Sequence, residues 1–271
     1  MPTIRTVADS AVMTAERPPV LEVREVTKSF GTIEALRGAD FTVHQGEVVA
    51  LVGDNGAGKS TLVKMISGVL QPDAGEIRFD GLPVSLASPI DARQLGIETV
   101  YQDLSLAPDL DCAANVFLGR ERLRPGLLGR LGVLDKAGMR RATQEAFTSL
   151  GTGIQNALVP VEGLSGGQRQ AVAVSRSVIW ASRVVLLDEP TAALGVVQTA
   201  KVADLIRRVR AAGVAVVLIS HNLPFVFDIA DRIEVLRLGR RAARLDVRSA
   251  SMIDVLGAMT GATVSDEENT Q

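Results

Sequence analysis

Eight residues have the types and spacing of a loop that binds phosphate. Gly53 to Ser60 read GDNGAGKS and match the pattern G-x-x-x-x-G-K-[S/T] between an apolar run and a helical one. Glycines let backbone N–H groups close around phosphate oxygens, and Lys59 supplies a mobile positive charge. The Ser60 hydroxyl would contact Mg²⁺. A merely structural glycine turn is the weaker interpretation, because strand, loop and helix follow in the order that phosphate binding requires.

Two adjacent carboxylates form a second candidate site. Asp188 closes the apolar run Val184–Leu187, and Glu189 follows it directly. Neighbouring residues of a strand point to opposite sides, so the two carboxylates are expected to have different tasks. Asp188 would hold Mg²⁺ through water, and Glu189 would act on the attacking water as a general base. The alternative for Glu189 is a surface carboxylate that pairs with a neighbouring cation.

Gln102 and His221 follow two further apolar runs. The Gln102 amide could reach Mg²⁺ or the attacking water, whereas the alternative is a buried glutamine that hydrogen-bonds to the backbone. His221 is expected to contact a γ-phosphate, and its alternative is a histidine held by hydrogen bonds within the core.

A second glycine-rich loop, LSGGQRQ, spans Leu164 to Gln170. Ser165 and Gln168 fit the capping box S-x-x-Q at the start of a helix. That interpretation leaves the pair Gly166-Gly167 unexplained, because glycines cost backbone entropy unless they let N–H groups approach a ligand closely. The first loop already surrounds its own nucleotide, so the second loop has no free phosphate in the same subunit.

Strands that end at one edge of a sheet would bring these sites together. Continuous apolar runs rich in β-branched residues predict strands buried on both faces, as in a parallel sheet, and ligands lie at the carboxyl ends of such strands. The predicted strands are Val48–Val52, Ile97–Tyr101, Val184–Leu187 and Val214–Ile219. The helices expected between them are Lys59–Leu70, Gln168–Ser182 and Lys201–Ala212.

The alternation of strands and helices breaks between Asp103 and Gly163. A segment rich in glycine, arginine and leucine, GRERLRPGLLGRLG, precedes the helical stretch Met139–Leu150, and no strong strand occurs there. We therefore expect an inserted helical subdomain at about 103–163, within a single domain that covers 20–262. Residues 1–19 are expected to form a flexible tail, and residues 263–271 a disordered acidic tail.

Composition excludes several classes of protein. The chain has 271 residues with a formal net charge of −2, and a nucleic-acid binder normally has a basic surface. No apolar run reaches the roughly 18 residues of a membrane span, and the first residues lack the apolar centre of a signal peptide. Cys112 is the only cysteine, so an intrachain disulfide is impossible and a reducing cytosol fits.

Taken in order, the motifs resemble those of the nucleotide-binding subunit of ABC transporters, in which LSGGQ is the signature sequence. The resemblance covers about Leu21 to Ala262. It implies an α/β fold of the P-loop NTPase type, with a mainly parallel core sheet, an antiparallel β portion and the inserted helical subdomain. It also implies an ATP-dependent, head-to-tail homodimer in which the second loop closes over the ATP held by the partner's first loop.

The resemblance assigns roles to individual residues of this sequence. It implies that Phe30 stacks on adenine, with ordinary core packing as the alternative. ATP is expected to contact Phe30, Gly53, Asn55, Gly56, Ala57, Gly58, Lys59, Ser60, Thr61, Gln102 and Asp188, and from the partner Ser165, Gly166, Gly167 and Gln168. The catalytic group comprises Lys59, Gln102, Glu189 and His221, and the Mg²⁺ ligands are Ser60, Gln102 and Asp188.

Longer segments, including EPTAALGVVQT, resemble the monosaccharide-import branch with its fructose- and ribose-type ATPases. Gly195 stands where the broad family has an aspartate that helps to couple the two sites, although this branch often carries glycine. The branch implies a peripheral subunit on the cytoplasmic face of the inner membrane. Its partners would be two transmembrane permease subunits and an extracytoplasmic sugar-binding protein, without nucleic acid.

Two other functions remain as alternatives. One is an ABC-type ATPase that acts on DNA or ribosomes, which usually shows tandem ATPase domains or a long coiled-coil insertion. The other is an importer subunit for a non-sugar cargo such as an amino acid or a lipid.

Overall fold

The computed structural model describes residues 18–192 and 194–262. The predicted acidic tail at 263–271, and all of the predicted tail at 1–19 except Pro18 and Pro19, therefore lie outside the described residues. The strands are β1 Leu21–Phe30, β2 Ile33–Val43, β3 Val48–Val52, β4 Ala74–Phe79, β5 Leu82–Val84, β6 Ile97–Val100, β7 Val184–Asp188, β8 Ala215–Ile219, β9 Arg232–Arg237 and β10 Arg240–Asp246. The α-helices are α1 Lys59–Ile66, α2 Pro89–Gln94, α3 Cys112–Phe117, α4 Leu127–Arg130, α5 Lys136–Leu150, α6 Gly166–Trp180, α7 Val196–Ala211, α8 Leu223–Ile229 and α9 Met252–Thr260, and a 3₁₀ turn covers Val161–Gly163.

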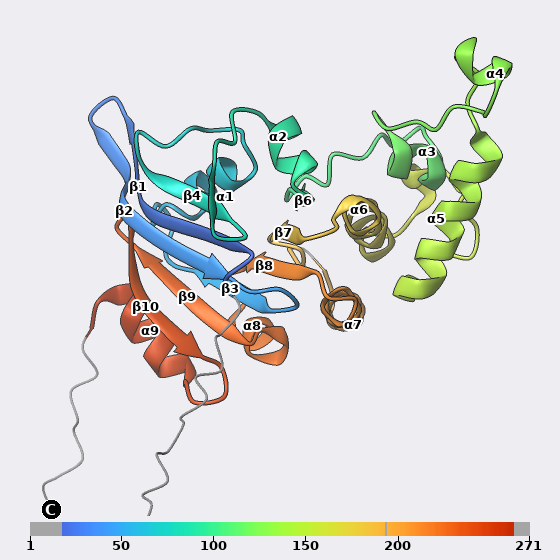
Figure 1. The fold of residues 1–271 in the computed structure, drawn as a ribbon. Coiled ribbons are helices and arrows are strands. Elements are labelled where there is room, and N and C mark those ends of the chain that lie inside the picture. Colours follow the sequence, from blue (N-terminus) through green and yellow to red (C-terminus); the bar gives the residue numbers. More distant parts are fainter. Residues whose placement is uncertain (1–17, 193, 263–271) are drawn as a thin grey trace, which may run out of the picture.

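The four predicted strands lie side by side in one sheet, as the sequence indicates. Within the described ranges this sheet has the order β10-β9-β3-β8-β7-β6, and every pair from β9 to β6 is parallel. β10 runs antiparallel at one edge. The carboxyl ends of β3, β8, β7 and β6 therefore meet at one edge, where the predicted site residues follow them (Figure 1).

The central strands β3, β7 and β8 are buried on both faces of this sheet, which explains why their sequences are almost continuously apolar. In β7, Val184 and Leu186 belong to a core shared with α1 and the antiparallel sheet. The intervening Val185 and Leu187 belong to a second core, formed with α6, α7 and α8. A single polar residue inside such a strand would therefore face an apolar layer on either side.

The antiparallel β portion is a separate four-stranded sheet of order β2-β1-β4-β5 among the described residues. It covers the face of the parallel sheet that carries α1, so that α1 lies between the two sheets (Figure 1). The fold class predicted from the sequence is confirmed in this respect.

The segment between β6 and α6 is largely helical and has its own hydrophobic cluster. Phe117 of α3 and Phe147 of α5 pack there with Val172 of α6. The neighbouring Ala173 and Val174 of α6 instead face the core beside the sheet. α6 therefore belongs to the packing of both parts, although it lies beyond the expected end of the insertion at Gly163 (Figure 1).

Several helix boundaries differ from the prediction, and three of the differences have a clear physical reason. α1 ends at Ile66 rather than Leu70, because Gly68 takes a left-handed φ of 73°. α6 starts at Gly166, two residues before Gln168, because Ser165 provides the cap. α7 starts at Val196 rather than Lys201, since the extended Gly195 is already its N-cap and the first turn is too exposed to show an apolar face.

No helix of the part that the structure describes is long and apolar enough to cross a membrane.

Candidate active site

The first glycine-rich loop leaves β3 and turns directly into α1. Its backbone follows the strand so tightly that Gly53 and Gly58 admit no side chain. A Cβ atom at Gly53 would lie 2.1 Å from the Leu236 carbonyl oxygen, and one at Gly58 would lie 2.7 Å from the Ala35 carbonyl oxygen. Both glycines also have positive φ, at 152° and 105°. The first turn of α1 contains no acidic residue, so its free N–H groups can face an anion.

Lys59 folds over this loop. Its Nζ donates to the carbonyl oxygens of Gly53 (2.6 Å) and Asp54 (3.0 Å). Burial lowers the pKa of the Lys59 ammonium below its usual value, while the carboxylates of Glu189, Asp54 and Asp188 act in the opposite direction. These charge interactions indicate that Lys59 lies near Asp188 and Glu189, the residues predicted to bind the metal and to act as the base.

Asp188 is the last residue of β7, and Glu189 leaves the strand. Burial raises the pKa of the Asp188 carboxyl above its usual range, and the negative charge of Glu189 adds to that effect. Glu189 has a left-handed φ of 49°, and its N–H donates to the Ile219 carbonyl oxygen (2.9 Å). A non-glycine residue rarely adopts this conformation, which here turns the Glu189 side chain along the sheet edge towards β8.

His221 is the partner of Glu189. Its Nδ1 lies 2.8 Å from Glu189 Oε1, and this hydrogen bond joins the ends of β7 and β8. The His221 side chain is 78% exposed, whereas that of Glu189 is 16% exposed. Core packing, the alternative for His221, is therefore wrong, and one edge of the Glu189–His221 pair is open to a ligand.

Three further predicted contacts, Phe30, Gln102 and Ser60, lie at the surface, whereas Ala57 of the first loop is buried. Phe30 ends β1 and is 47% exposed, so ordinary core packing is wrong for this residue. Gln102 follows β6 and is exposed, so the alternative of a buried, backbone-satisfied glutamine is wrong too. Ser60 is exposed in the first turn of α1. The roles in adenine stacking and metal binding stay predictions.

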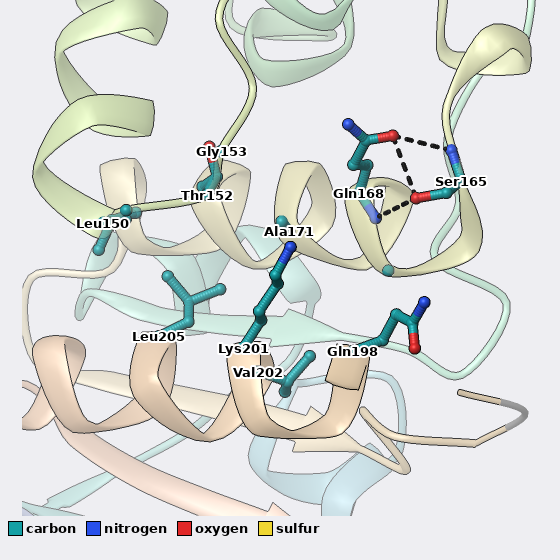
Figure 2. A pocket seen from close by; sticks show the side chains of 12 residues that line it. Leu150, Thr152, Gly153, Ser165, Gln168, Ala171, Gln198, Lys201, Val202 and Leu205 are labelled. Carbon is teal, nitrogen blue, oxygen red and sulfur yellow. Dashed lines mark hydrogen bonds between the residues drawn. The ribbon is translucent and has the colours of Figure 1, made fainter. Parts of the chain in front are cut away.

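The second glycine-rich loop is a capped helix start. The Ser165 N–H donates to Gln168 Oε1 (3.0 Å), and the Gln168 N–H donates to Ser165 Oγ (3.4 Å), which completes the predicted capping box (Figure 2). Gly166 and Gly167 are the first two residues of α6 and have helical backbone conformations. A Cβ at Gly167 would lie 2.8 Å from Gln198 Cγ, but one at Gly166 would meet nothing closer than Leu194 Cδ2 at 3.6 Å.

Gly166 is therefore free of any packing requirement. Of the two glycines, only Gly167 is required by packing, because Gln198 at the start of α7 leaves no room for a Cβ atom there. Ser165 and Gly166 are exposed, and the first N–H groups of α6 lack helical partners. A cavity of about 200 Å³ beside the loop is lined by α6, α7 and the turn after α5, and by no residue of Gly53–Ser60 (Figure 2). The two glycine-rich loops of one chain therefore do not line the same cavity.

Sequence reasoning missed the contacts that support these loops. Leu236 of β9 and Ala35 of β2 close the space around the first loop, and Gln198 of α7 does so for the second. Nothing in their local sequence marks them, because each acts through a contact distant along the chain. The pairing of His221 with Glu189 was also missed, although both residues were predicted to lie at the same edge.

The phosphate loop, the carboxylates at the end of a strand and the parallel sheet together define a P-loop nucleotide hydrolase. The ABC transporter family model matches residues 36–192, and the chain belongs to the ABC transporter family. It is 50% identical over 246 residues to the fructose import ATP-binding protein FrcA of Rhizobium meliloti. This match covers 90% of this chain and 95% of that protein. It is 48% identical to the xylose/arabinose import ATP-binding protein XylG of Sulfolobus acidocaldarius, with 82% and 86% covered.

A third relative, the ribose import ATP-binding protein RbsA 2 of Burkholderia pseudomallei, is 42% identical. The match spans 91% of this chain but 47% of that protein, so this chain has about half its length. Among solved structures, a component of an ABC transporter complex from Clostridium perfringens has 26% identity and a TM-score of 0.73, with 90% and 95% covered. A dimeric ATP-binding cassette in a post-hydrolysis state, bound to ADP and phosphate, has 25% identity and a TM-score of 0.70, with 85% and 100% covered.

The two glycines of the signature loop give a matched pair of variants. Gly167→Ala is expected to destabilise the fold by about 1 kcal/mol or more, because the new Cβ crowds Gln198. Gly166→Ala is expected to leave the midpoint of thermal unfolding within about 3 °C of wild type, yet to lower ATP turnover about tenfold or more. Thermal unfolding and steady-state ATP turnover check both. Equal turnover in Gly166→Ala and wild type would show that the exposed N–H face of this glycine has no ligand.

Proposed function

We propose that this chain is the ATP-hydrolysing subunit of an ABC importer and that the cargo is a monosaccharide. The observation that carries the proposal is the 50% identity with a fructose import ATP-binding protein over almost the full length of both chains. Relatives named for xylose/arabinose and ribose import support the sugar class rather than one sugar. A non-sugar cargo, and an ATPase that acts on DNA or ribosomes, are disfavoured by these relatives.

We further propose that Mg²⁺ accompanies the nucleotide and is held by Ser60, Asp188 and Gln102. Their hydroxyl, carboxylate and amide oxygens are the hard donors that Mg²⁺ prefers. Burial and the neighbouring Glu189 disfavour the charged form of Asp188, so a cation beside it would relieve this unfavourable electrostatics. Among residues 18–192 and 194–262, no group of three or more His, Cys, Asp or Glu could hold a metal ion. In this proposal, phosphate and water oxygens complete the shell of Mg²⁺. Bound Mg²⁺ would neutralise phosphate charge.

In the proposed hydrolysis, the protein positions ATP and removes a proton. Phe30 stacks on adenine, while the loop backbone from Gly53 to Thr61 and the Lys59 ammonium hold the phosphates. Glu189 accepts a proton from the attacking water, and His221, fixed by its hydrogen bond to Glu189, contacts the γ-phosphate. Gln102 contacts the metal or the water from the end of β6. In this proposal Glu189 is the base, and Lys59 contacts the phosphates in both the ground state and the transition state.

The proposed working unit is a head-to-tail homodimer. Ser165, Gly166, Gly167 and Gln168 of one subunit would close over ATP on the other, which supplies the anion that the exposed start of α6 lacks. The dimeric state of the related cassette bound to ADP and phosphate supports this assembly. We also propose that residues 20–262 act as one domain, with 103–163 as its helical subdomain and α6 shared in packing.

Two transmembrane permease subunits are the proposed partners, with delivery by an extracytoplasmic sugar-binding protein and no nucleic acid. The chain would then lie peripherally on the cytoplasmic face of the inner membrane. A cavity of about 560 Å³ between α3 and α5 could receive a permease helix. Its lining includes Asp109, Asp111 and Glu121, and the exposed apolar side chains of Leu110 and Leu118.

Leu110→Glu combined with Leu118→Glu is expected to abolish permease association while basal ATP turnover stays within about twofold of wild type, because a charge in an apolar groove opposes docking. Leu82→Glu, an exposed leucine on the antiparallel sheet and outside this cavity, is the control. Co-purification from membranes and ATP turnover measure the two effects. Crosslinks to permease that map only around Gly195 would overturn the proposed docking surface.

The cargo is tested on the assembled transporter. The tagged chain is purified from membranes with its partners, which are identified by mass spectrometry and reconstituted into vesicles. ATP-dependent uptake of fructose, xylose, arabinose or ribose is the expected result. Association with ribosomes or DNA, or uptake of amino acids in place of these sugars, would overturn it.

A further inference from the structure

The segment of residues 122–135, which we call the leucine–arginine hairpin, presents apolar side chains to solvent. Leu127 and Leu131 are 72% and 73% exposed, and three more apolar residues beside them are also exposed, namely Leu123, Leu128 and Val133. Isolated exposed leucines are normal, but five exposed apolar residues within eleven are a local concentration that calls for an explanation. Figure 1 shows its helix α4 at the far end of the helical part, beyond α3 and α5 and away from both sheets.

The hairpin is an ordered scaffold. The Arg124 N–H donates to the Val133 carbonyl oxygen (2.9 Å), and Leu123 and Leu134 form an antiparallel bridge. Gly129 is buried, and a Cβ there would lie 1.9 Å from the Arg124 carbonyl oxygen. Backbone hydrogen bonds within the hairpin therefore hold its shape. The leucines project from it at defined positions and do not pack into a core.

Positive charge surrounds these leucines. Residues 122–135 contain three arginines and one aspartate, a net charge of +2 in a chain whose total is −2. Arg120 pairs with Glu98, and the Arg122 guanidinium lies 4.9 Å from the centre of the Phe117 ring. In contrast, Arg124 and Arg130 are exposed and form no ion pair with any residue of 18–192 or 194–262.

We propose that the leucine–arginine hairpin binds the anionic headgroup surface of a lipid bilayer. Exposed leucines beside unpaired arginines match an interface with acyl chains below and phosphate groups above, because arginine keeps its charge at headgroup level while its stem and the leucines enter the apolar boundary. Charge complementarity identifies the anionic lipid. The cavity between α3 and α5 has the concave form that suits a protein helix, and its lining excludes Leu127, Leu128 and Leu131.

This contact goes beyond the proposed function. Attachment to a permease through the groove would hold the chain at the membrane, whereas the hairpin adds a second, protein-independent contact with the lipid. One weak anchor gives reversible binding, and two together give stable attachment.

The test uses the purified full chain and vesicles that contain no permease. Flotation with vesicles of equal parts phosphatidylcholine and phosphatidylglycerol should recover the wild type, and pure phosphatidylcholine should not. Leu127→Ser with Leu131→Ser should weaken partitioning about tenfold or more. Arg124→Ala with Arg130→Ala should weaken it by about fivefold per arginine, and high salt should do the same for wild type. Leu82→Ser, a similarly exposed leucine on the antiparallel sheet, should bind like wild type.

Thermal unfolding and ATP turnover of every variant should match wild type, because the changed side chains lie in solvent. Absence of wild-type flotation with anionic vesicles would overturn the proposal, as would flotation unaffected by the leucine pair. If the leucine pair instead loses only permease co-purification, the hairpin docks on protein and the lipid proposal is wrong. None of these results bears on sugar uptake, so failure here is distinguishable from failure of the proposed function.

Discussion

Replacing Glu189 by glutamine is expected to lower ATP turnover by about 10²–10⁴-fold, the typical loss when a general base is removed. Glutamine keeps the shape of the side chain and can still hydrogen-bond to His221, which lies 2.8 Å from Glu189 in the wild type. It also removes a negative charge near the γ-phosphate, so ATP should bind at least as tightly. Light scattering should therefore show a stable ATP-bound dimer, with twice the mass of the nucleotide-free chain.

Lys59→Ala is the control for this variant. Lys59 Nζ contacts the loop itself and would contact phosphate in the ground state and in the transition state, so its loss should weaken ATP binding together with turnover. Steady-state kinetics and a nucleotide-binding assay separate the two variants. If Glu189→Gln keeps more than about a tenth of wild-type turnover, the assignment of Glu189 as base is wrong, and His221 becomes the next candidate.

Ser165→Arg is expected to reduce ATP turnover by about 10²-fold or more while the monomer binds ATP as well as wild type. Ser165 is exposed at the start of α6, and a bulky cation there would block the approach of the partner's nucleotide. Ser165→Ala is the matched control for the lost cap. It removes the hydrogen bond to Gln168, at a cost of about 1 kcal/mol, without adding bulk.

Mixing the two defective chains decides whether the signature loop acts on the partner. A dimer of one Ser165→Arg chain and one Lys59→Ala chain contains one intact site, built from the first loop of the former and the signature loop of the latter. Turnover should therefore recover in the mixture, although each chain alone is inactive. A mixture as inactive as its components would indicate that LSGGQRQ serves the nucleotide of its own chain.

The sequence alone predicts the parallel strands and the edge where they meet, because burial on both faces leaves continuous apolar runs in β3, β7 and β8. The start of α7 could not be predicted, since its first turn is exposed and carries no apolar periodicity. The sequence also could not predict that Gly53 and Gly167 lack room for a side chain, because that space is filled by atoms of Leu236 and Gln198. Motifs made of consecutive residues can be recognised in the sequence, whereas steric limits set by distant segments cannot.

α6 has a mechanical consequence for the proposed transporter. Its last residue, Trp180, packs edge-on against Phe117 with ring centres 5.4 Å apart, and its indole N–H donates to the Val116 carbonyl oxygen (3.0 Å). Phe117 lines the cavity proposed for the permease, while the opposite end of α6 begins at the Ser165 cap. A helix of 15 residues is about 22 Å long and bends little. We therefore expect that a partner that presses on α3 tilts α6 and moves the loop that we propose closes on the neighbouring subunit's ATP.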